Sequence, residues 1–338
     1  MLAKSNHPTL VDVAREAGVS LKTASRVLNS SSGIAPATAK KVRAAMSGLG
    51  YRPNELARGL KGKRSAAIGM VVPNLADPFI ASSVQAVQEV ARSHGHVLIL
   101  TSSGGDESLE REEVETLLRR QVDGLIIAPA DGRNNTVESF LSANIPVVAF
   151  DRPMQNADMD YITVTNRDAA REATEHLISH GYRNILAIGA RPHLYTCSER
   201  LAGYVSTMKR AALAKETFLV EHESELTPEA INDLLGGPKK LDAIFSLNGV
   251  MTMLLLRALR QLKQTIGTDV PLISFDDFDL AEVLTPSLTV VRQPSAELGR
   301  QAAQMLFSRI QSDKVVAYQK IVLSTTFHLR ESCGCPEH

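Results

Sequence analysis

From residue 66 onward, short runs rich in β-branched residues alternate with helical segments, and this alternation constrains the fold more than any other feature. Such alternation is typical of parallel sheets covered by helices. The runs are continuously apolar, as expected for strands buried on both faces. Ten such runs exceed what one compact lobe usually carries, so the sequence predicts two α/β lobes. The predicted strands are residues 68–72, 97–101, 124–128, 146–150, 161–165, 185–189, 218–222, 243–247, 272–275 and 288–291.

Residues 9–50 have a different pattern, which predicts three short helices. Thr9 is placed to cap the first helix, with Asp12 as a weak capping-box partner. Ser20 can cap a second helix over Leu21 to Leu28. The third is predicted over 36–49, with Pro36 near its start, where the usual capping serine or threonine is missing.

The second of these helices has two unlike sides. Ala24, Val27 and Leu28 lie on one side, which we expect to face the first helix. The other side carries a cation, a guanidinium, a hydroxyl and an amide, groups that read base edges in a major groove. The alternative is an ordinary helical hairpin with a solvated face. The residues of this outward side are Leu21, Lys22, Ser25, Arg26 and Asn29.

The charge is unevenly distributed. Residues 1–64 hold 12 Lys or Arg and 3 Asp or Glu, whereas the remainder holds 25 basic and 34 acidic residues. A basic head on an acidic body favours a polyanionic partner, and nucleic acid is the first candidate. A charged surface with no partner is the alternative.

The segment 52–64 separates this head from the body. Asn54 can cap a helix over 55–60, which is shorter than the roughly 12–15 residues an isolated helix needs. Gly59 weakens it further. A flexible linker is therefore the simplest interpretation from composition.

Several motifs together resemble the lactose/galactose-repressor family of bacterial transcription regulators. The headpiece motif is TLVDVAREAGVSLKTASRVLN (9–29), followed by KVRAAMSGLGYRPNELARGL (41–60). The resemblance extends over essentially the whole chain, through VVPNLADPF (71–79), VDGLIIAP (122–129), VVAFDRP (147–153), HLISHGYRNILAIG (176–189), ERLAGY (199–204), ISFDDFDLAEVLTPSLTVVRQP (273–294) and LRES (329–332).

The resemblance implies an α/β fold in which a three-helix helix-turn-helix headpiece and a hinge helix precede a two-lobed domain like the periplasmic binding proteins. The headpiece would span residues 1–52 and the hinge helix and linker 53–65. The effector-binding and dimerisation domain would span 66–332, with a tail at 333–338. Lobe one is then expected at about 66–164 and 294–323, and lobe two at about 165–293 and 324–332.

In that family, paired hinge helices insert a leucine into the minor groove of the operator, and the matching residue is Leu60. Such a wedge costs about a few kcal/mol of unstacking, offset by added contact. Alternatively, Leu60 only packs at the domain boundary. The chain ends at His338 without the family's tetramerising leucine segment, so we expect a homodimer on double-stranded operator DNA. The DNA contacts implied are Thr9, Leu21, Lys22, Thr23, Ser25, Arg26, Asn29, Ala57, Arg58 and Leu60.

The resemblance also implies a small-molecule effector, a sugar or sugar derivative, held between the lobes. Each expected contact follows a predicted strand or starts a helix, where open α/β sheets bind ligands. Asp276 or Asp277 can instead simply cap a helix. The family often has Asn-Asp where this chain has Asn248-Gly249, which leaves the effector's identity open. The expected set is Phe79 as a stacking face, with Asp151, Arg200, Asn248, Asp276 and Gln293 as polar contacts.

Other signals are weaker. His176 and His180 have a spacing that can bind zinc but no evident third ligand, and Cys333-Gly-Cys335 alone is weak evidence for a metal. We therefore expect neither metal nor cofactor. No phosphate loop or nucleophile motif occurs, so an enzyme is not expected.

Three cysteines, no signal-like start and no apolar run of about 18 residues favour a cytoplasmic protein without a membrane span. Two other classes remain as alternatives. A solute-binding receptor without a transcriptional role explains the body but not the basic head. An α/β enzyme with an accessory headpiece lacks a convergent nucleophile or base.

Overall fold

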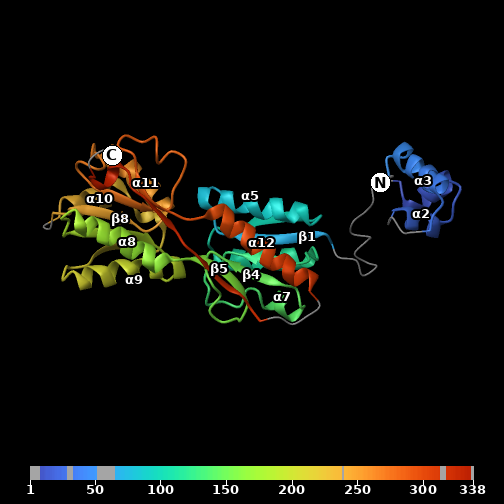
Figure 1. The fold of residues 1–338 in the computed structure, drawn as a ribbon, viewed down its shortest axis with the longest axis horizontal. Helices are drawn as coiled ribbons and strands as arrows, with labels where there is room; N and C mark the ends of the chain where they lie inside the picture. Colours follow the sequence, from blue (N-terminus) through green and yellow to red (C-terminus); the bar gives the residue numbers. More distant parts are fainter. Residues whose placement is uncertain (1–7, 29–32, 52–64, 238–239, 313–316, 336–338) are drawn as a thin grey trace, which may run out of the picture. The chain divides into compact units, whose positions relative to one another are not determined.

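The computed structural model describes residues 8–28, 33–51, 65–237, 240–312 and 317–335. The chain divides into two compact units, Met1–Ser65 and Ala66–His338 (Figure 1). Within the described ranges, no helix is both long enough and apolar enough to cross a membrane.

The first unit contains α1 (Leu10–Glu16), α2 (Leu21–Leu28) and α3 (Pro36–Gly48). The three helices share a small core in which Val13, Ala24 and Val42 are fully buried. The predicted capping box is present, since the Asp12 amide donates to Thr9 Oγ1 and the Thr9 amide donates to Asp12 Oδ2. The α3 helix begins without a side-chain cap, as predicted, and has proline in its first turn.

Lobe one of the second unit is built on a parallel six-stranded sheet of order β11-β5-β4-β3-β1-β2. One core lies between this sheet and the helices α5 and α12, which lie side by side in Figure 1, and a second core lies on the opposite face. The strands are β1 (Ala67–Val72), β2 (Val97–Ser102), β3 (Leu125–Ile127), β4 (Val147–Phe150), β5 (Asp160–Val164) and β11 (Lys320–Leu323). The helices are α5 (Pro78–Ser93), α6 (Glu107–Arg119), α7 (Glu138–Ser142) and α12 (Ser295–Gln311).

Lobe two has a six-stranded sheet of order β12-β10-β9-β8-β6-β7, in which only β12 runs antiparallel to its neighbour. The pair α8 and α9 encloses one core and the pair α10 and α11 another. The strands are β6 (Ile185–Ala190), β7 (Glu216–Val220), β8 (Ala243–Ser246), β9 (Leu272–Phe275), β10 (Thr289–Arg292) and β12 (Thr326–His328). The helices are α8 (Asn166–Ser179), α9 (Tyr195–Arg210), α10 (Pro228–Leu235) and α11 (Gly249–Gln261), with 3-10 turns η1 (Glu223–Glu225) and η2 (Glu331–Cys333).

The chain passes between the two lobes three times. It leaves lobe one after β5, returns between β10 and α12, and leaves again between β11 and β12. The first and third passages lie side by side, because the Thr325 amide donates to Thr165 Oγ1 at 3.3 Å. Each lobe is therefore assembled from separate parts of the chain.

The predicted α/β fold is confirmed, and all ten predicted strands occur with ends within two residues of the prediction. Two strands were missed, β11 and β12, which lie at the edges of their sheets. The residues of β11 alternate between exposed and partly buried, and those of β12 are exposed or partly buried. They therefore lack the continuous apolar run by which the other strands were recognised.

Helices α8 and α9 pack closely because Gly203 has no side chain. A Cβ at this position would lie 2.3 Å from the Arg167 carbonyl oxygen and 3.1 Å from the Arg171 amide nitrogen. Both contacts are backbone atoms, so the helices would have to separate.

We therefore expect Gly203→Ala to lower the free energy of unfolding by about 1–3 kcal/mol, measured as a fall in melting temperature. The control is Ser206→Ala, at an exposed site one turn further along α9. This substitution should change the free energy of unfolding by no more than about 0.5 kcal/mol. Equal melting temperatures for Gly203→Ala and the unmodified chain would contradict the packing argument.

Candidate DNA-reading surface and effector cavity

The exposed side of α2 is the one predicted to read DNA. Leu21, Lys22 and Arg26 are exposed, and Thr23 and Ser25 are partly so, whereas Ala24 and Val27 are buried. The Ser20 side chain caps the helix, since its Oγ accepts a hydrogen bond from the Thr23 amide at 3.1 Å. Leu21 is 49% exposed and belongs to this outward side.

Thr9 has a structural role in the headpiece. Its hydroxyl donates to Asp12 Oδ2 at 2.6 Å, and these Thr9 hydrogen bonds lower the pKa of Asp12 below its usual range. The residue is nevertheless exposed, at the first turn of α1. The other predicted DNA contacts, Asn29, Ala57, Arg58 and Leu60, lie outside the described residues.

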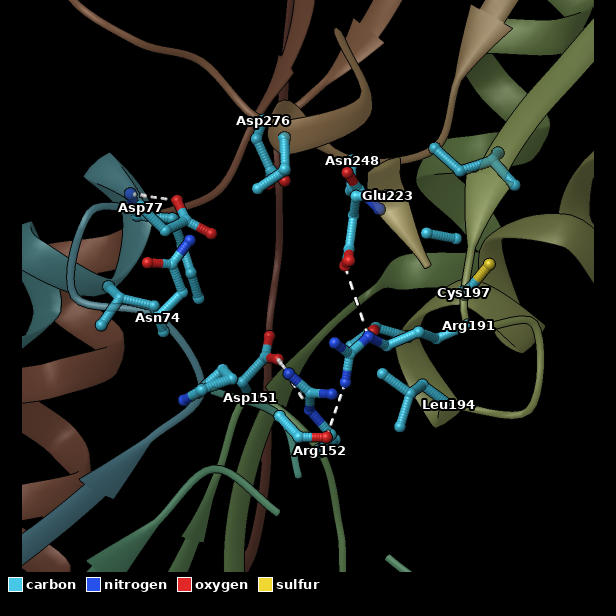
Figure 2. Close-up of a pocket in the computed structure, with 18 of the residues that line it drawn as sticks. Asn74, Asp77, Asp151, Arg152, Arg191, Leu194, Cys197, Glu223, Asn248 and Asp276 are labelled. Carbon is cyan, nitrogen blue, oxygen red and sulfur yellow. Dashed lines mark hydrogen bonds and ion pairs between the residues drawn. The ribbon is translucent and has the colours of Figure 1, made fainter. Parts of the chain in front are cut away.

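A cavity of about 350 Å³ lies between the two lobes of the second unit. All six residues predicted to contact an effector line it: Phe79, Asp151, Arg200, Asn248, Asp276 and Gln293. Asp151, Asn248 and Asp276 approach it from different elements in Figure 2. The four residues Asp151, Asn248, Asp276 and Gln293 directly follow or closely follow strands β4, β8, β9 and β10. The carboxyl ends of the strands thus build the site, as in other open parallel sheets.

Asp276 connects the parts of the site contributed by lobe two. Its Oδ1 accepts from Gln293 Nε2 at 2.5 Å and its Oδ2 from the Gly249 amide at 3.0 Å. A Cβ on Gly249 would lie 3.2 Å from the Asp276 Cβ. The glycine that replaces the family's usual aspartate therefore brings the start of α11 close to this carboxylate.

Arg200 is held rigidly by neighbouring groups. Its Nε donates to Asn166 Oδ1 at 2.8 Å, and its Nη1 donates to the Leu247 carbonyl at 2.7 Å. The guanidinium lies over the Phe275 ring, 3.6 Å from the centroid. Among the described residues, Nη2 has no hydrogen-bond partner, so it remains available to a ligand in the cavity.

Two further carboxyl groups are affected by their burial in the cavity. Burial and the nearby charge of Asp276 raise the pKa of Asp77 to about 7. Asp77 also caps α5, since its Oδ1 accepts from the Phe79 amide at 2.9 Å. Burial likewise raises the pKa of Asp151, whose Oδ2 accepts from Arg152 Nε at 3.2 Å. Both Asp151 and Asp276 have positive φ angles, 68° and 79°, so the backbone is strained on both sides of the cavity.

Sequence reasoning missed several cavity residues, of which Arg191 is the most informative. It follows β6, and its Nη1 and Nη2 donate to the carbonyls of Gly105 and Gly104 in the other lobe, at 2.6 and 3.4 Å. Its Nε lies 3.4 Å from Glu223 Oε1, as Figure 2 shows. Arg191 therefore fastens one lobe to the other. Its position after a predicted strand was a usable signal. Asn74, Asp77, Arg152, Leu194 and Glu223 were missed as well.

Comparison with known proteins agrees with both parts of this architecture. Residues 9–54 match the model of bacterial regulatory proteins of the lacI family, and residues 174–333 match that of periplasmic binding protein-like domains. The ribose operon repressor of Escherichia coli K12 is 33% identical over 306 residues, covering 89% of this chain and 93% of the relative. The transcriptional repressor PurR of Photobacterium profundum is 32% identical, covering 89% of this chain and 92% of the relative.

Solved structures extend the match to the whole fold. The lac repressor dimer bound to operator and the anti-inducer ONPF superposes with a TM-score of 0.83 at 26% identity, covering 97% of this chain and 99% of that chain. A complex of the transcriptional regulator CelR with cellobiose superposes with a TM-score of 0.69 at 29% identity. The match covers 96% of this chain and 100% of that chain. The chain therefore belongs to the lacI family of bacterial regulatory proteins and is a DNA-binding transcriptional regulator.

Proposed function

We propose that this regulator is a homodimeric repressor that acts in the cytoplasm. Its affinity for the operator changes when a neutral sugar, or an uncharged sugar derivative, binds in the cavity. The observation that carries this proposal is the balance of charge among the cavity residues. This charge balance bears only on the chemical class of the effector. Membership of the lacI family rests on the comparisons above.

Each of the three guanidinium groups in the cavity lies close to a carboxylate. Arg152 lies 3.2 Å from Asp151, Arg191 lies 3.4 Å from Glu223, and Arg200 lies 3.7 Å from Asp276. Asp77 adds a further carboxyl. No surplus of positive charge is thus available for a phosphate or a sugar acid. Paired donors and acceptors of this kind suit the adjacent hydroxyls of an uncharged sugar.

The apolar part of the cavity supports the same class of ligand. The Phe79 ring stacks on Phe150 with centroids 5.8 Å apart, which offers one fixed aromatic face beside many polar groups. The cavity volume, about 350 Å³, is within the range of small-molecule sites. Among similar proteins, CelR was solved with cellobiose, and a relative from Alkaliphilus metalliredigens with D-xylulofuranose at 25% identity.

For DNA, we propose that α2 enters the major groove and that the segment 53–65 supplies the hinge contacts. One short helix reads only a few base pairs, and a two-fold dimer doubles the site. The operator-bound lac repressor dimer, similar over 97% of this chain, supports that arrangement. The proposed contacts are Thr9, Leu21, Lys22, Thr23, Ser25, Arg26, Asn29, Ala57, Arg58 and Leu60.

The proposed mechanism is thermodynamic linkage without bond chemistry. Operator and effector prefer different arrangements of the lobes, so each shifts the population that the other binds. A coupling of about 1–3 kcal/mol corresponds to a roughly 5–150-fold change in operator affinity. A solute receptor without a transcriptional role would use the same cavity but would leave the exposed side of α2 without a purpose.

For the recognition helix, we expect Arg26→Lys to weaken binding to the selected operator by about 1–3 kcal/mol and to relax specificity at one base position. Lysine keeps the charge but cannot make the bidentate contact. The salt dependence of binding should therefore stay the same, whereas Arg26→Ala should reduce it. Binding-site selection from random DNA provides the measurement, and an unchanged preference in both variants would rule out this role.

For the effector cavity, a thermal-shift screen should show that neutral sugars raise the melting temperature more than sugar acids and sugar phosphates do. With the best ligand, Arg200→Ala should lose about 2–5 kcal/mol of effector binding while operator binding persists. Arg210→Ala is the matched control, since Arg210 lies in the same helix but is exposed and paired with Glu175. Calorimetry that finds normal effector affinity in Arg200→Ala would refute the assignment.

The raised pKa of Asp77 predicts a pH effect with a definite sign. Since its pKa is about 7 in the folded protein and 3.8 ordinarily, folding favours the protonated form. The free energy of unfolding of the ligand-free protein should therefore fall as the pH rises from 3.8 to about 7. Asp77→Asn keeps the helix cap and removes the charge, so its gain in melting temperature should be larger at pH 8 than at pH 5.

The control for this experiment is Asp106→Asn, because Asp106 caps α6 in the same way but is exposed. Its melting temperature should follow the pH dependence of the unmodified chain. If Asp77→Asn also followed it, the carboxyl of Asp77 would not be the group responsible.

A further inference from the structure

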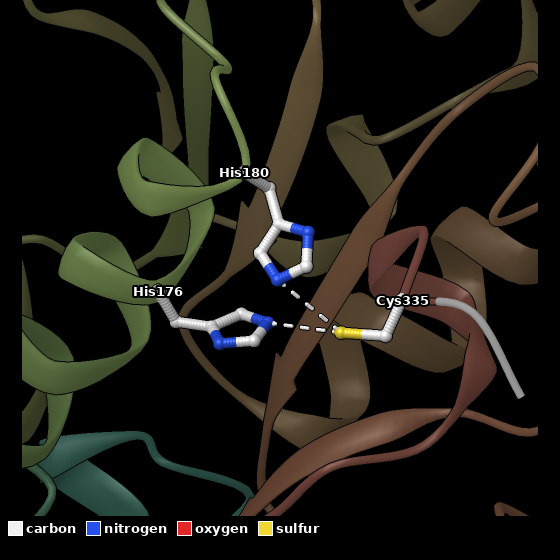
Figure 3. Close-up of side chains that lie close together, drawn as sticks. All are labelled: His176, His180 and Cys335. Atoms are coloured by element: carbon white, nitrogen blue, oxygen red, sulfur yellow. Dashed lines mark hydrogen bonds between the residues drawn. The ribbon is translucent and has the colours of Figure 1, made fainter. Parts of the chain in front are cut away.

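Four potential metal ligands meet at the end of α8, away from both sites described above. His176 lies in the last turn of α8 and His180 caps the helix. Cys333 ends η2, and Cys335 follows two residues later. The ligand atoms of His176, His180 and Cys335 all lie within 4.8 Å of one another, and Figure 3 shows both rings turned toward the sulfur.

The distances between these atoms are those of a metal site. Cys335 Sγ lies 3.5 Å from His176 Nε2 and 3.4 Å from His180 Nε2. A tetrahedral zinc ion with ordinary bond lengths would place nitrogen and sulfur ligands about 3.6 Å apart. Both nitrogen-to-sulfur distances are thus already close to those that a zinc ion requires.

Cys333 lies beside this group of three and is the candidate fourth ligand. Its Sγ lies 3.3 Å from His176 Nε2 and 3.0 Å from Cys335 Sγ. Two thiolates on zinc would lie about 3.8 Å apart, so the sulfurs need to separate by roughly 0.8 Å. Gly334 between the two cysteines has a φ of 80° and ends the 3-10 turn in the left-handed conformation.

The surroundings hold these side chains in place. Ser332 Oγ donates to the Leu272 carbonyl at 2.6 Å, and Tyr182 Oη donates to the Cys333 carbonyl at 3.2 Å. Thr289 Oγ1 lies 3.3 Å from Cys333 Sγ and 2.9 Å from the Arg330 carbonyl oxygen. The His176 ring packs edge-on against Phe327 and the His180 ring stacks on Tyr182. Ligands fixed in this way lose little conformational freedom when an ion binds.

We propose that His176, His180, Cys333 and Cys335 bind one zinc-class divalent ion. Two imidazoles and two thiolates are a characteristic ligand set of structural zinc sites, and the softness of the sulfurs disfavours magnesium and calcium. From sequence spacing alone, the histidine pair and the Cys-Gly-Cys segment were two separate, weak signals for a metal site. The fold brings together residues 155 positions apart, and so supplies the third and fourth ligands.

The ion would fasten the end of the chain to α8. The opposite end of this helix begins at Asn166, whose side chain holds Arg200 in the effector cavity. The site therefore stabilises lobe two through the helix that also positions a cavity residue. The inference does not depend on the proposed effector class.

The test uses the full chain, purified in a reductant that does not bind metal. Bound metal is removed with a chelator, and the protein is then titrated with Zn²⁺ or Co²⁺. We expect one ion per chain and a cobalt spectrum with tetrahedral and thiolate-to-cobalt bands. His180→Ala and Cys335→Ser should each lower zinc affinity by at least about 100-fold. Zinc should raise the melting temperature of the unmodified chain but not that of His180→Ala.

Ser179→Ala is the matched control, because Ser179 is exposed and lies between the two histidines in sequence. It should bind zinc as the unmodified chain does. Absence of stoichiometric metal under reducing conditions would overturn the proposal. So would zinc binding that survives in both His180→Ala and Cys335→Ser, or a Cys333–Cys335 disulfide that persists in the presence of glutathione and zinc.

Discussion

The three passages of the chain between the lobes are the constraint on which the effector cavity depends. Asn166 follows the first passage directly and holds Arg200, while Gln293 lies at the second and binds Asp276. Thr165 and Thr325 fasten the first and third passages to each other. The residues that organise the cavity therefore lie at or next to the passages that connect the two lobes. A ligand that changes these hydrogen bonds also changes the favoured arrangement of the lobes.

The electrostatics of the cavity make that arrangement sensitive to what binds. Arg191 reaches from one lobe to two carbonyls of the other, and the pKa values of the partly buried Asp77 and the buried Asp151 are raised. A buried polar group without a full set of partners is costly, and hydroxyl groups of a ligand can supply partners. Gln293 Oε1, for example, is buried and has no hydrogen-bond partner among the described residues.

Much of the fold could be predicted because its signals are local. Continuous apolar runs identified the strands buried on both faces, and Thr9, Ser20 and Pro36 gave the starts of three helices. The edge strands β11 and β12 escaped because half-exposed strands carry no such run. Four of the six predicted effector contacts reach one cavity because parallel strands end at one edge of each sheet, and helices α5 and α9 supply the other two, Phe79 and Arg200. Arg191 also follows a strand directly and could have been predicted in the same way. The contact between His180 and Cys335 depends on tertiary structure, which sequence spacing does not reveal.

The proposed coupling between the cavity and the DNA-reading surface, through the lobes, is tested most directly by reciprocal linkage. Operator affinity is measured with and without saturating effector, and effector affinity with and without saturating operator, on the same preparation. Both affinities should change by the same factor, roughly 5–150-fold, since linkage requires equality. Operator affinity that does not change while the effector demonstrably occupies the cavity would contradict it.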